Sequence, residues 1–271
     1  MNKFFLTLFI ASIIIGSVGC DGAEKQILLS YKYQLNDIIE YKQSTRETSR
    51  KIVDSQLSEQ HNYLYNGILS QQVIEVLQDN RVIILEKTSQ LIDGEKKNVT
   101  EINYVLSSTG TIEDINFSKN SEKKNEIYIK NHYQSGTPLF PKMEVFPGYL
   151  WTQTISVVVP DEKLEASTTY EVIAFVREAG YDCALIKYNG EMIVPVNIKE
   201  NDSTQISGQN KIISNGIIYF AYKEGIIISQ KDEWKISGDR TKTTNSKRES
   251  YTVEIDINSD FLLTKFVRNS N

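Results

Sequence analysis

The fold class of this chain is decided by Gly216-Ile-Ile-Tyr-Phe-Ala-Tyr-Lys-Glu-Gly-Ile-Ile-Ile-Ser-Gln-Lys-Asp-Glu-Trp-Lys-Ile236. Two apolar runs, Ile217–Tyr222 and Ile226–Ile236, flank the turn residues Lys223-Glu224-Gly225. In the second run every other residue, from Ile226 through Gln230 and Asp232 to Trp234 and Ile236, falls on one face. A period of two is typical of a β-strand, so this stretch predicts an antiparallel hairpin.

The same period recurs on both sides of this hairpin. This period, or an apolar run between turn signals, predicts strands over residues 27–35, 39–45, 82–86, 104–106, 111–117, 151–159, 170–176, 181–188, 192–198, 251–257 and 261–267. Residues 63–77 are apolar at irregular spacing around Gly67, which indicates a bulge or a close approach of the backbone. Asn189-Gly190 is expected to be the type I′ turn of a further hairpin, because both central residues of that turn need a positive φ. Crossover helices are missing, so we exclude a parallel sheet. The fold class predicted is all-β (minor α): a large curved antiparallel sheet, an open barrel or a sandwich, with at most one or two short helices.

One polar segment interrupts the strands. Residues 118–135 are rich in Lys, Glu, Asn and Ser, and Ser121 is a candidate cap for a short helix. Pro138, Pro141 and Pro147 follow, and proline cannot donate to a central ladder. We therefore expect an extended loop whose aromatic residues cover an open end of the sheet. The polar segment is also a candidate boundary between two sub-sheets. Ile212–Tyr222 is apolar on both faces, so part of the sheet is expected to be covered twice.

The first twenty residues have the layout of a secretory signal. Lys3 precedes the uncharged run Phe4–Gly16, and Ser17-Val18-Gly19-Cys20 follows. These residues resemble the lipobox of bacterial lipoproteins, which implies that the thiol of Cys20 is acylated and that the chain is cut just before it. An ordinary cleaved signal or a membrane-anchoring helix are the alternatives. The domains expected are a signal peptide (1–19), a lipidated tether (20–26) and a single antiparallel β domain (27–267).

The charge composition limits the classes of partner that this chain is expected to bind. The 271 residues carry 30 Lys and Arg against 35 Asp and Glu, for a formal charge of −5. Acids and bases are interspersed, so no basic strip indicates nucleic acid, and we expect no nucleic-acid partner. The expected partners are a membrane, reached through the N-terminal lipid, and a hydrophobic ligand or another envelope protein.

A second resemblance spans most of the chain after the signal. Its features are the long meander, the proline-rich middle with Gly148-Tyr-Leu-Trp151, and the hairpin Gly216–Ser229. This order resembles a group of uncharacterised bacterial envelope lipoproteins. More distantly, it is similar to the lipoprotein-localisation-factor fold, an unclosed antiparallel barrel with helices over its mouth that holds acyl chains. The resemblance implies a hydrophobic ligand but no particular binding residue.

The chain has no recognisable catalytic motif: no Gly-x-Ser-x-Gly, His-Glu-x-x-His, Cys-x-x-Cys or phosphate loop occurs. His61 and His132 are the two histidines, and each is interpreted as a surface residue, although a site with carboxylates such as Glu59 and Asp79 stays open. Cys183 lies in an apolar run and is interpreted as a small buried hydrophobe. We expect no catalytic residue, metal or cofactor.

The tyrosines leave a further choice open. The chain has 15, and they are either ordinary strand residues with one apolar face or a surface that stacks on polysaccharide. They include Tyr31, Tyr33, Tyr41, Tyr63, Tyr65, Tyr219 and Tyr222. The function expected is a non-catalytic envelope lipoprotein that binds an apolar ligand such as an acyl chain. The alternatives are a structural or protein-interaction module, and a carbohydrate-binding or hydrolytic protein with an unrecognised carboxylate site.

Overall fold

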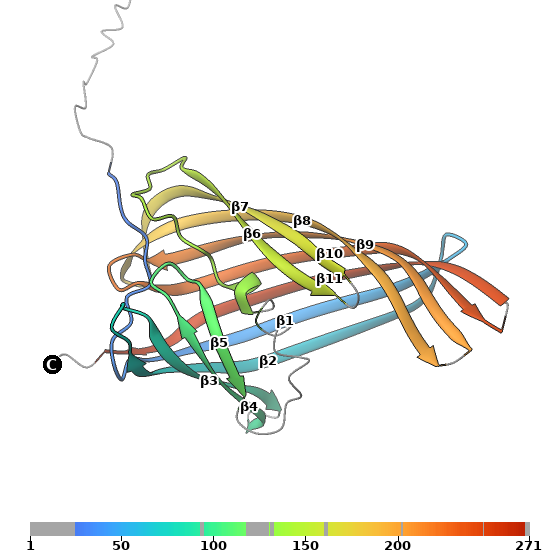
Figure 1. The fold of residues 1–271 in the computed structure, drawn as a ribbon, viewed down its shortest axis with the longest axis horizontal. Helices are drawn as coiled ribbons and strands as arrows, with labels where there is room; N and C mark the ends of the chain where they lie inside the picture. The colour runs from blue at the N-terminus through green and yellow to red at the C-terminus, as the bar shows by residue number, and fades with distance from the viewer. Residues whose placement is uncertain are drawn as a thin grey trace, which may run out of the picture.

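The computed structural model describes residues 25–92, 95–117, 130, 133–159, 162–201, 203–245 and 247–268. Eleven strands dominate these residues (Figure 1). They are β1 (Ile38–Val53), β2 (Gln56–Val76), β3 (Val82–Ile92), β4 (Glu95–Leu106), β5 (Ile112–Phe117), β6 (Leu150–Val159), β7 (Glu162–Glu178), β8 (Tyr181–Asn201), β9 (Thr204–Ala221), β10 (Ile226–Thr244) and β11 (Lys247–Val267). A short helical turn at residues 133–136 lies between β5 and β6 along the chain.

All eleven strands belong to one antiparallel sheet, in the order β5-β4-β3-β2-β1-β11-β10-β9-β8-β7-β6. The first and last strands pair with each other at its centre, where Ile38 lies opposite Val267. The two edges, β5 and β6, therefore come from the middle of the chain. Figure 1 shows the sheet curling so that both edges turn toward the same side without pairing. The all-β, antiparallel and unclosed fold is confirmed, and the boundary between two sub-sheets predicted at residues 118–135 is wrong, because the strands before and after this segment belong to one sheet.

Two hairpin turns have the backbone of type I′. Asp54 and Ser55 join β1 to β2 with φ of 49° and 62°, and Ala179 and Gly180 join β7 to β8 with φ of 48° and 88°. The predicted turn at Asn189-Gly190 is wrong. Asn189 pairs with Thr169 on one side and Asn215 on the other, because two continuous ladders outweigh one local turn preference.

One end of the sheet is closed by segments from several parts of the chain. Residues 25–36, the proline-rich loop 137–148 and the turn between β9 and β10 meet there, and we call it the plugged end. Phe140 of the loop packs on Phe220 of β9 with ring centroids 4.5 Å apart, and Tyr31 packs on both rings. The prediction that aromatics of this loop cover an open end of the sheet is confirmed.

The predicted strand over residues 27–35 is wrong, although its alternation is real. Leu29 and Tyr31 are buried while Leu28 and Lys32 are exposed. The backbone, however, is shared among three neighbours: Ile27 pairs with Val145, Tyr31 donates to Ser108 and Lys32 donates to Gly225. Because these acceptors lie on different segments, the chain is extended here without joining a ladder.

On β9, side chains on both faces of the sheet are buried only near the plugged end. Phe220 and Ala221, adjacent on β9, are both fully buried, and adjacent strand residues point to opposite faces. Three residues earlier, Ile217 is 42% exposed, so the outer face is bare there. The prediction of two-sided burial over Ile212–Tyr222 is therefore wrong at Ile217, in the middle of that range.

An ion pair ties the two ends of the β domain together at the plugged end. Asp37, whose surface is fully buried, accepts hydrogen bonds from Arg268, and the Nη2–Oδ2 distance is 2.8 Å. The same guanidinium donates to the carbonyl oxygens of Lys32 and Glu224. We call this arrangement the Asp37–Arg268 latch, because it links the segment before β1, the β9–β10 turn and the residue after β11.

Candidate ligand cavity

A cavity of about 850 Å³ lies inside the curved sheet. Side chains of β1–β4 and β6–β11 line it, together with Tyr31 and Tyr33 before β1, Tyr133 and residues 135–137. Tyrosine is the most frequent lining residue, and the other lining side chains include Leu, Ile, Met, Phe and Trp together with a comparable number of Ser, Thr and Gln. Ligand sites for small molecules have volumes of about 300 to 1,000 Å³ and mostly apolar walls, so the cavity has the size and the character of such a site.

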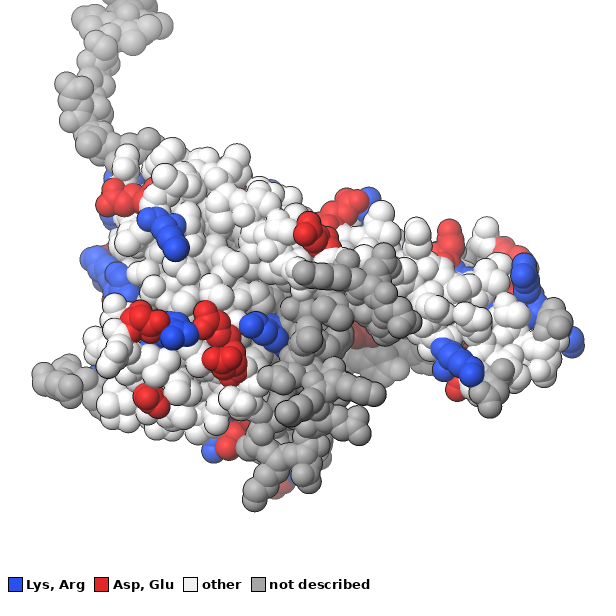
Figure 2. Space-filling view, viewed as in Figure 1, with Lys and Arg blue, Asp and Glu red and all other residues white. Residues whose placement is uncertain are grey.

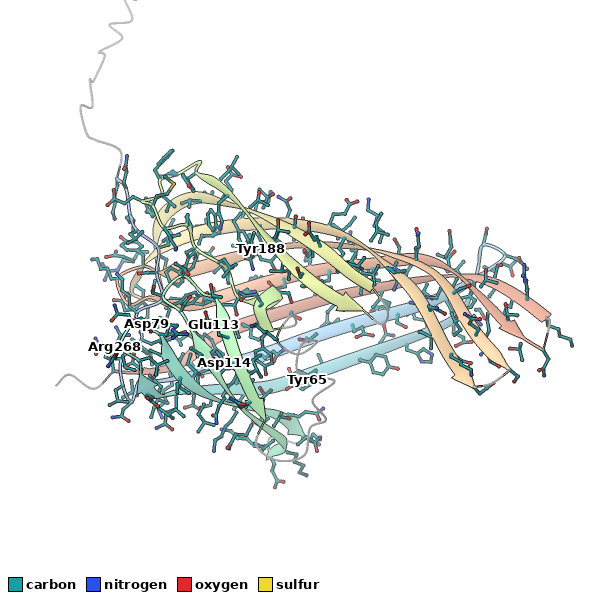
Figure 3. The ribbon with its side chains drawn as sticks, viewed as in Figure 1. Tyr65, Asp79, Glu113, Asp114, Tyr188 and Arg268 are labelled. Atoms are coloured by element: carbon teal, nitrogen blue, oxygen red, sulfur yellow. The ribbon has the colours of Figure 1, made fainter. Side chains whose placement is uncertain are left out.

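One cross-strand row crosses this cavity from β6 to β2. Its members, each the direct partner of the next, are Trp151, Tyr170, Tyr188, Gly216, Asp232, Ser259, Thr45 and Tyr65. Figure 3 labels Tyr188 and Tyr65 in the two halves of the sheet, on either side of the central strands. Trp151 stacks on Tyr170 with centroids 5.1 Å apart and planes 12° apart, and Tyr170 contacts Tyr188 at 5.6 Å. The row is therefore aromatic at its β6 end and polar at its centre.

Gly216 lies where the row changes from aromatic to polar residues, and it makes room for the ring of Tyr188. A Cβ at this position would lie 2.4 Å from the Tyr188 ring, so only glycine leaves room for the ring to cross β9. The Tyr188 hydroxyl thereby reaches β10 and donates to Oδ1 of Asp232 at 2.5 Å. Gln230 donates to both oxygens of Asp232, at 3.0 and 3.1 Å. Burial raises the pKa of Asp232, and the charge of Asp260 acts in the same direction.

A second carboxyl group, that of Glu86 on β3, lies in the wall on the other side of the cavity. Only 2% of its surface is exposed. Its Oε2 accepts hydrogen bonds from Gln71 Nε2 and from the Tyr104 hydroxyl, each at 3.0 Å, and Tyr133 also donates to this carboxyl group. Its Oε1 has no hydrogen-bond partner among the described residues. Burial raises the pKa of Glu86, against the effect of these donors.

The tyrosines around these two groups stay protonated. Burial, together with the charge of Glu86, raises the pKa of Tyr33, Tyr104 and Tyr133. Burial and the charge of Asp232 do the same for Tyr170 and Tyr188. The cavity wall therefore presents phenol hydroxyl groups as neutral hydrogen-bond donors around carboxyl groups.

The structure separates the residues that the sequence offered for a histidine–carboxylate site. His61 lies on β2 beside Glu59, with Nε2 and Oε2 3.8 Å apart, and both side chains are more than half exposed. Asp79 lies beyond the opposite end of β2 and pairs with Arg81 at 2.6 Å. His132 and Cys20 lie outside the described residues. Across the described ranges no three His, Cys, Asp or Glu side chains form a group suited to a metal ion.

Cys183 is a buried residue of β8. It packs with Ile39, Tyr41, Ala221, Ile226 and Ile228 in a second, smaller apolar cluster, and none of its surface is exposed. Burial raises the pKa of its thiol to about 11. A thiol is nucleophilic only when deprotonated, so Cys183 behaves as the small hydrophobe that the sequence predicts.

Of the tyrosines singled out in the sequence, Tyr31, Tyr33, Tyr41 and Tyr65 line the cavity. Tyr63 is 59% exposed and Tyr222 is buried at the plugged end. The sequence analysis missed Glu86 and Asp232, although both carry a signal. Glu86 continues the buried face of Val82 and Ile84, and Asp232 lies on the same face as Trp234. A carboxylate on a strand face that is otherwise largely apolar is the sequence signal for a buried carboxyl group.

Charges on the outer surface are mixed in sign. Figure 2 shows Lys and Arg side by side with Asp and Glu on the visible face. The ion pair Lys87–Glu101 connects the neighbouring strands β3 and β4, and Arg81, just before β3, pairs with Glu113 of β5. Within the residues that the structure describes, no helix has the length and hydropathy to cross a membrane.

No family model and no curated protein sequence matches the chain. Three solved structures are similar to it only weakly. A Bacteroides fragilis protein with a YmcC-like fold has 9% identity and a TM-score of 0.24, over 89% of this chain and 100% of that one. Pseudomonas aeruginosa OpdQ has 6% identity and a TM-score of 0.25, over 85% and 98%. Yersinia pestis Ail has 4% identity and a TM-score of 0.14, over 84% and 99%. Scores this low carry no argument about function, so the function proposed below rests on the residues of this chain.

Proposed function

We propose that this protein is a non-catalytic lipoprotein of the bacterial cell envelope whose curved sheet binds an apolar ligand such as an acyl chain. The observation that carries the proposal is the cavity of about 850 Å³ inside the sheet. Its lining combines aromatic and aliphatic side chains with Ser, Thr and Gln side chains and the buried carboxyl groups of Glu86 and Asp232, and small-molecule sites likewise combine apolar walls with placed polar groups. Burial of apolar ligand surface there contributes about 25 cal/mol per Å².

Trp234 provides a direct test, because it lines the cavity and the chain has two tryptophans. A fatty acid brominated in mid-chain, bound inside the sheet, is expected to quench at least half of the Trp234 emission of the full-length protein. The Trp234→Phe variant, which retains Trp151, is the matched control and should lose most of this quenching. Equal quenching in the two proteins, or none in either, would contradict binding inside the cavity.

The lipid anchor is tested through the two cysteines. When cells that make the full-length protein are fed radioactive palmitate, we expect label on the wild type and on Cys183→Ser, and none on Cys20→Ser. Cys183 serves as the control because its thiol is buried and its raised pKa keeps it protonated. Loss of label in Cys183→Ser alone would refute the anchor at Cys20. The Cys20→Ser protein should also leave the membrane fraction, because acyl chains provide the membrane affinity.

A protein-interaction module is the second candidate function, and the sheet edges favour it. Among the described residues β6 pairs with β7 on one side only, and Leu150 at its start is 61% exposed. An unpaired edge is a template for an added strand. A protein crosslinked in cells through residue 150, in place of a bound lipid, would favour this function over the first.

A further inference from the structure

The charged side chains that line the cavity are all acidic. They are Glu86, Asp232 and Glu191, and no Lys, Arg or His belongs to the described lining. Glu191 is exposed and pairs with Lys211 at 2.8 Å, so its charge is already balanced. Glu86 and Asp232 form no ion pair with any described residue, and their hydrogen bonds come from the neutral groups of Gln71, Tyr104, Tyr133, Tyr188 and Gln230.

A buried carboxyl group without a cation is costly, and removing water from a charge costs several kcal/mol. The hydrogen bonds offset part of this cost at Asp232, where both oxygens accept. They do so less completely at Glu86, because Oε1 accepts none. The wall therefore holds one carboxyl oxygen with unused capacity to accept a hydrogen bond, and because Oε1 is itself buried, a ligand reaches it only when a neighbouring lining side chain moves aside.

The aromatic lining also favours a cationic ligand over an anionic one. Tyrosine rings from β1, β2, β4 and β8, with Trp234 of β10, face the cavity. The face of an aromatic ring attracts a cation within about 6 Å of its centroid, and desolvation strengthens the attraction. An anionic head group, in contrast, would meet two carboxyl groups and no described basic partner inside the sheet.

We propose that the ligand of this cavity is an amphiphile whose polar end is an organic cation, an alkylammonium group that Glu86 binds by a hydrogen bond and that Asp232, across the cavity, attracts by its charge. This inference rests on the function proposed above and names the chemistry of its ligand. The ammonium group donates to the free oxygen of Glu86, and its alkyl chain occupies the aromatic and aliphatic part of the cavity. A free fatty acid is then a poor mimic of the natural ligand, binding through its chain alone.

The test compares three probes with the same chain length: dodecylamine, dodecanol and dodecanoate, each titrated into the full-length protein near pH 7.5. The change in Trp234 emission, corrected with Trp234→Phe, gives each affinity. We expect dodecylamine to bind at least tenfold more tightly than the other two. Dodecanoate or dodecanol binding as tightly as the amine would overturn the inference and leave the proposed function intact. Failure of all three probes, and of the brominated fatty acid, would refute the proposed function itself.

Variants of Glu86 and Asp232 test whether these two carboxyl groups cause the preference for the amine. Glu86→Gln and Asp232→Asn are each expected to weaken dodecylamine binding about tenfold and to change dodecanol binding less than twofold. Glu191→Gln is the matched control: it removes a lining carboxylate that is exposed and already paired, and should change both affinities less than twofold. An undiminished preference for the amine in both Glu86→Gln and Asp232→Asn would overturn the assignment. The wild-type comparison of probes needs no variant, so it stands if one of these proteins does not fold.

Discussion

Replacing Phe220 with alanine is expected to lower the free energy of unfolding by about 4 kcal/mol, the middle of the range for buried aromatic residues. Phe220 is fully buried and is the largest such side chain among the described residues. Its ring contacts Phe140 at 4.5 Å and Tyr31 at 5.5 Å. The substitution thus removes contacts to the proline-rich loop and to residues 25–36 at once, and leaves a cavity at the plugged end.

Ile217→Ala is the control, because Ile217 lies on the same strand but is 42% exposed. This variant should lose less than about 1.5 kcal/mol of unfolding free energy, because the Ile217 side chain keeps much of its contact with water in the folded state. Urea unfolding of the full-length proteins, followed by tryptophan fluorescence, measures both values. Similar losses in the two variants would show that the plug contributes little to stability.

The second large effect is expected at the Asp37–Arg268 latch. Arg268→Met keeps much of the side-chain volume but leaves the carboxylate of Asp37, which has no exposed surface, without a cationic partner. Removing one partner of a buried ion pair costs about 3 to 5 kcal/mol. Arg268 is itself 22% exposed, so we expect a loss near the lower limit, about 3 kcal/mol, in the same urea experiment.

Two further variants separate the latch from a general effect of charge. Arg50→Met removes an arginine that pairs with Asp256 at 2.7 Å, where both side chains are about one third exposed, and should cost less than about 1 kcal/mol. Arg268→Lys keeps the charge but loses the planar fork that also reaches two carbonyl groups, so an intermediate loss is expected. A loss below 1 kcal/mol in Arg268→Met would contradict the role of the latch.

The parts of the fold that depend on local alternation could be predicted from the sequence. The hairpin formed by residues 217–236 and the reversal at Thr109-Gly110 are present in the structure. The partner of each strand could not be predicted in the same way. That β1 pairs with β11 depends on residues at opposite ends of the chain, and periodicity carries no information about pairs that far apart. The Asn189-Gly190 turn failed because both residues pair with β7 on one side and β9 on the other, and a dipeptide preference carries no information about how far a strand continues.

The residues of the site likewise include some that the sequence predicts and some that it does not. Apolar and aromatic positions that line the cavity follow from alternation, and Tyr31, Tyr33, Tyr41 and Tyr65 were noted as candidates for a binding surface. The roles of Glu86 and Asp232 were not predicted, because they depend on how the sheet curves. The contact of Tyr188 with Asp232 requires a side-chain-free position at Gly216 on the intervening strand, and this becomes evident only once the three strands are in register.

The pairing of the first strand with the last has a consequence for how this protein reaches its native state. Asp37 and Arg268 are 231 residues apart in sequence, and closing a loop of that length costs about 5 kcal/mol of chain entropy. The strands from β1 to β5 and from β6 to β10 can form successive hairpins as they emerge, but β11 must arrive before the two halves join. Sheets dominated by distant contacts fold slowly. The cavity, whose walls come from both halves, therefore forms only after β11 has been synthesised, and the ligand that we propose would enter the assembled sheet rather than an unfinished one.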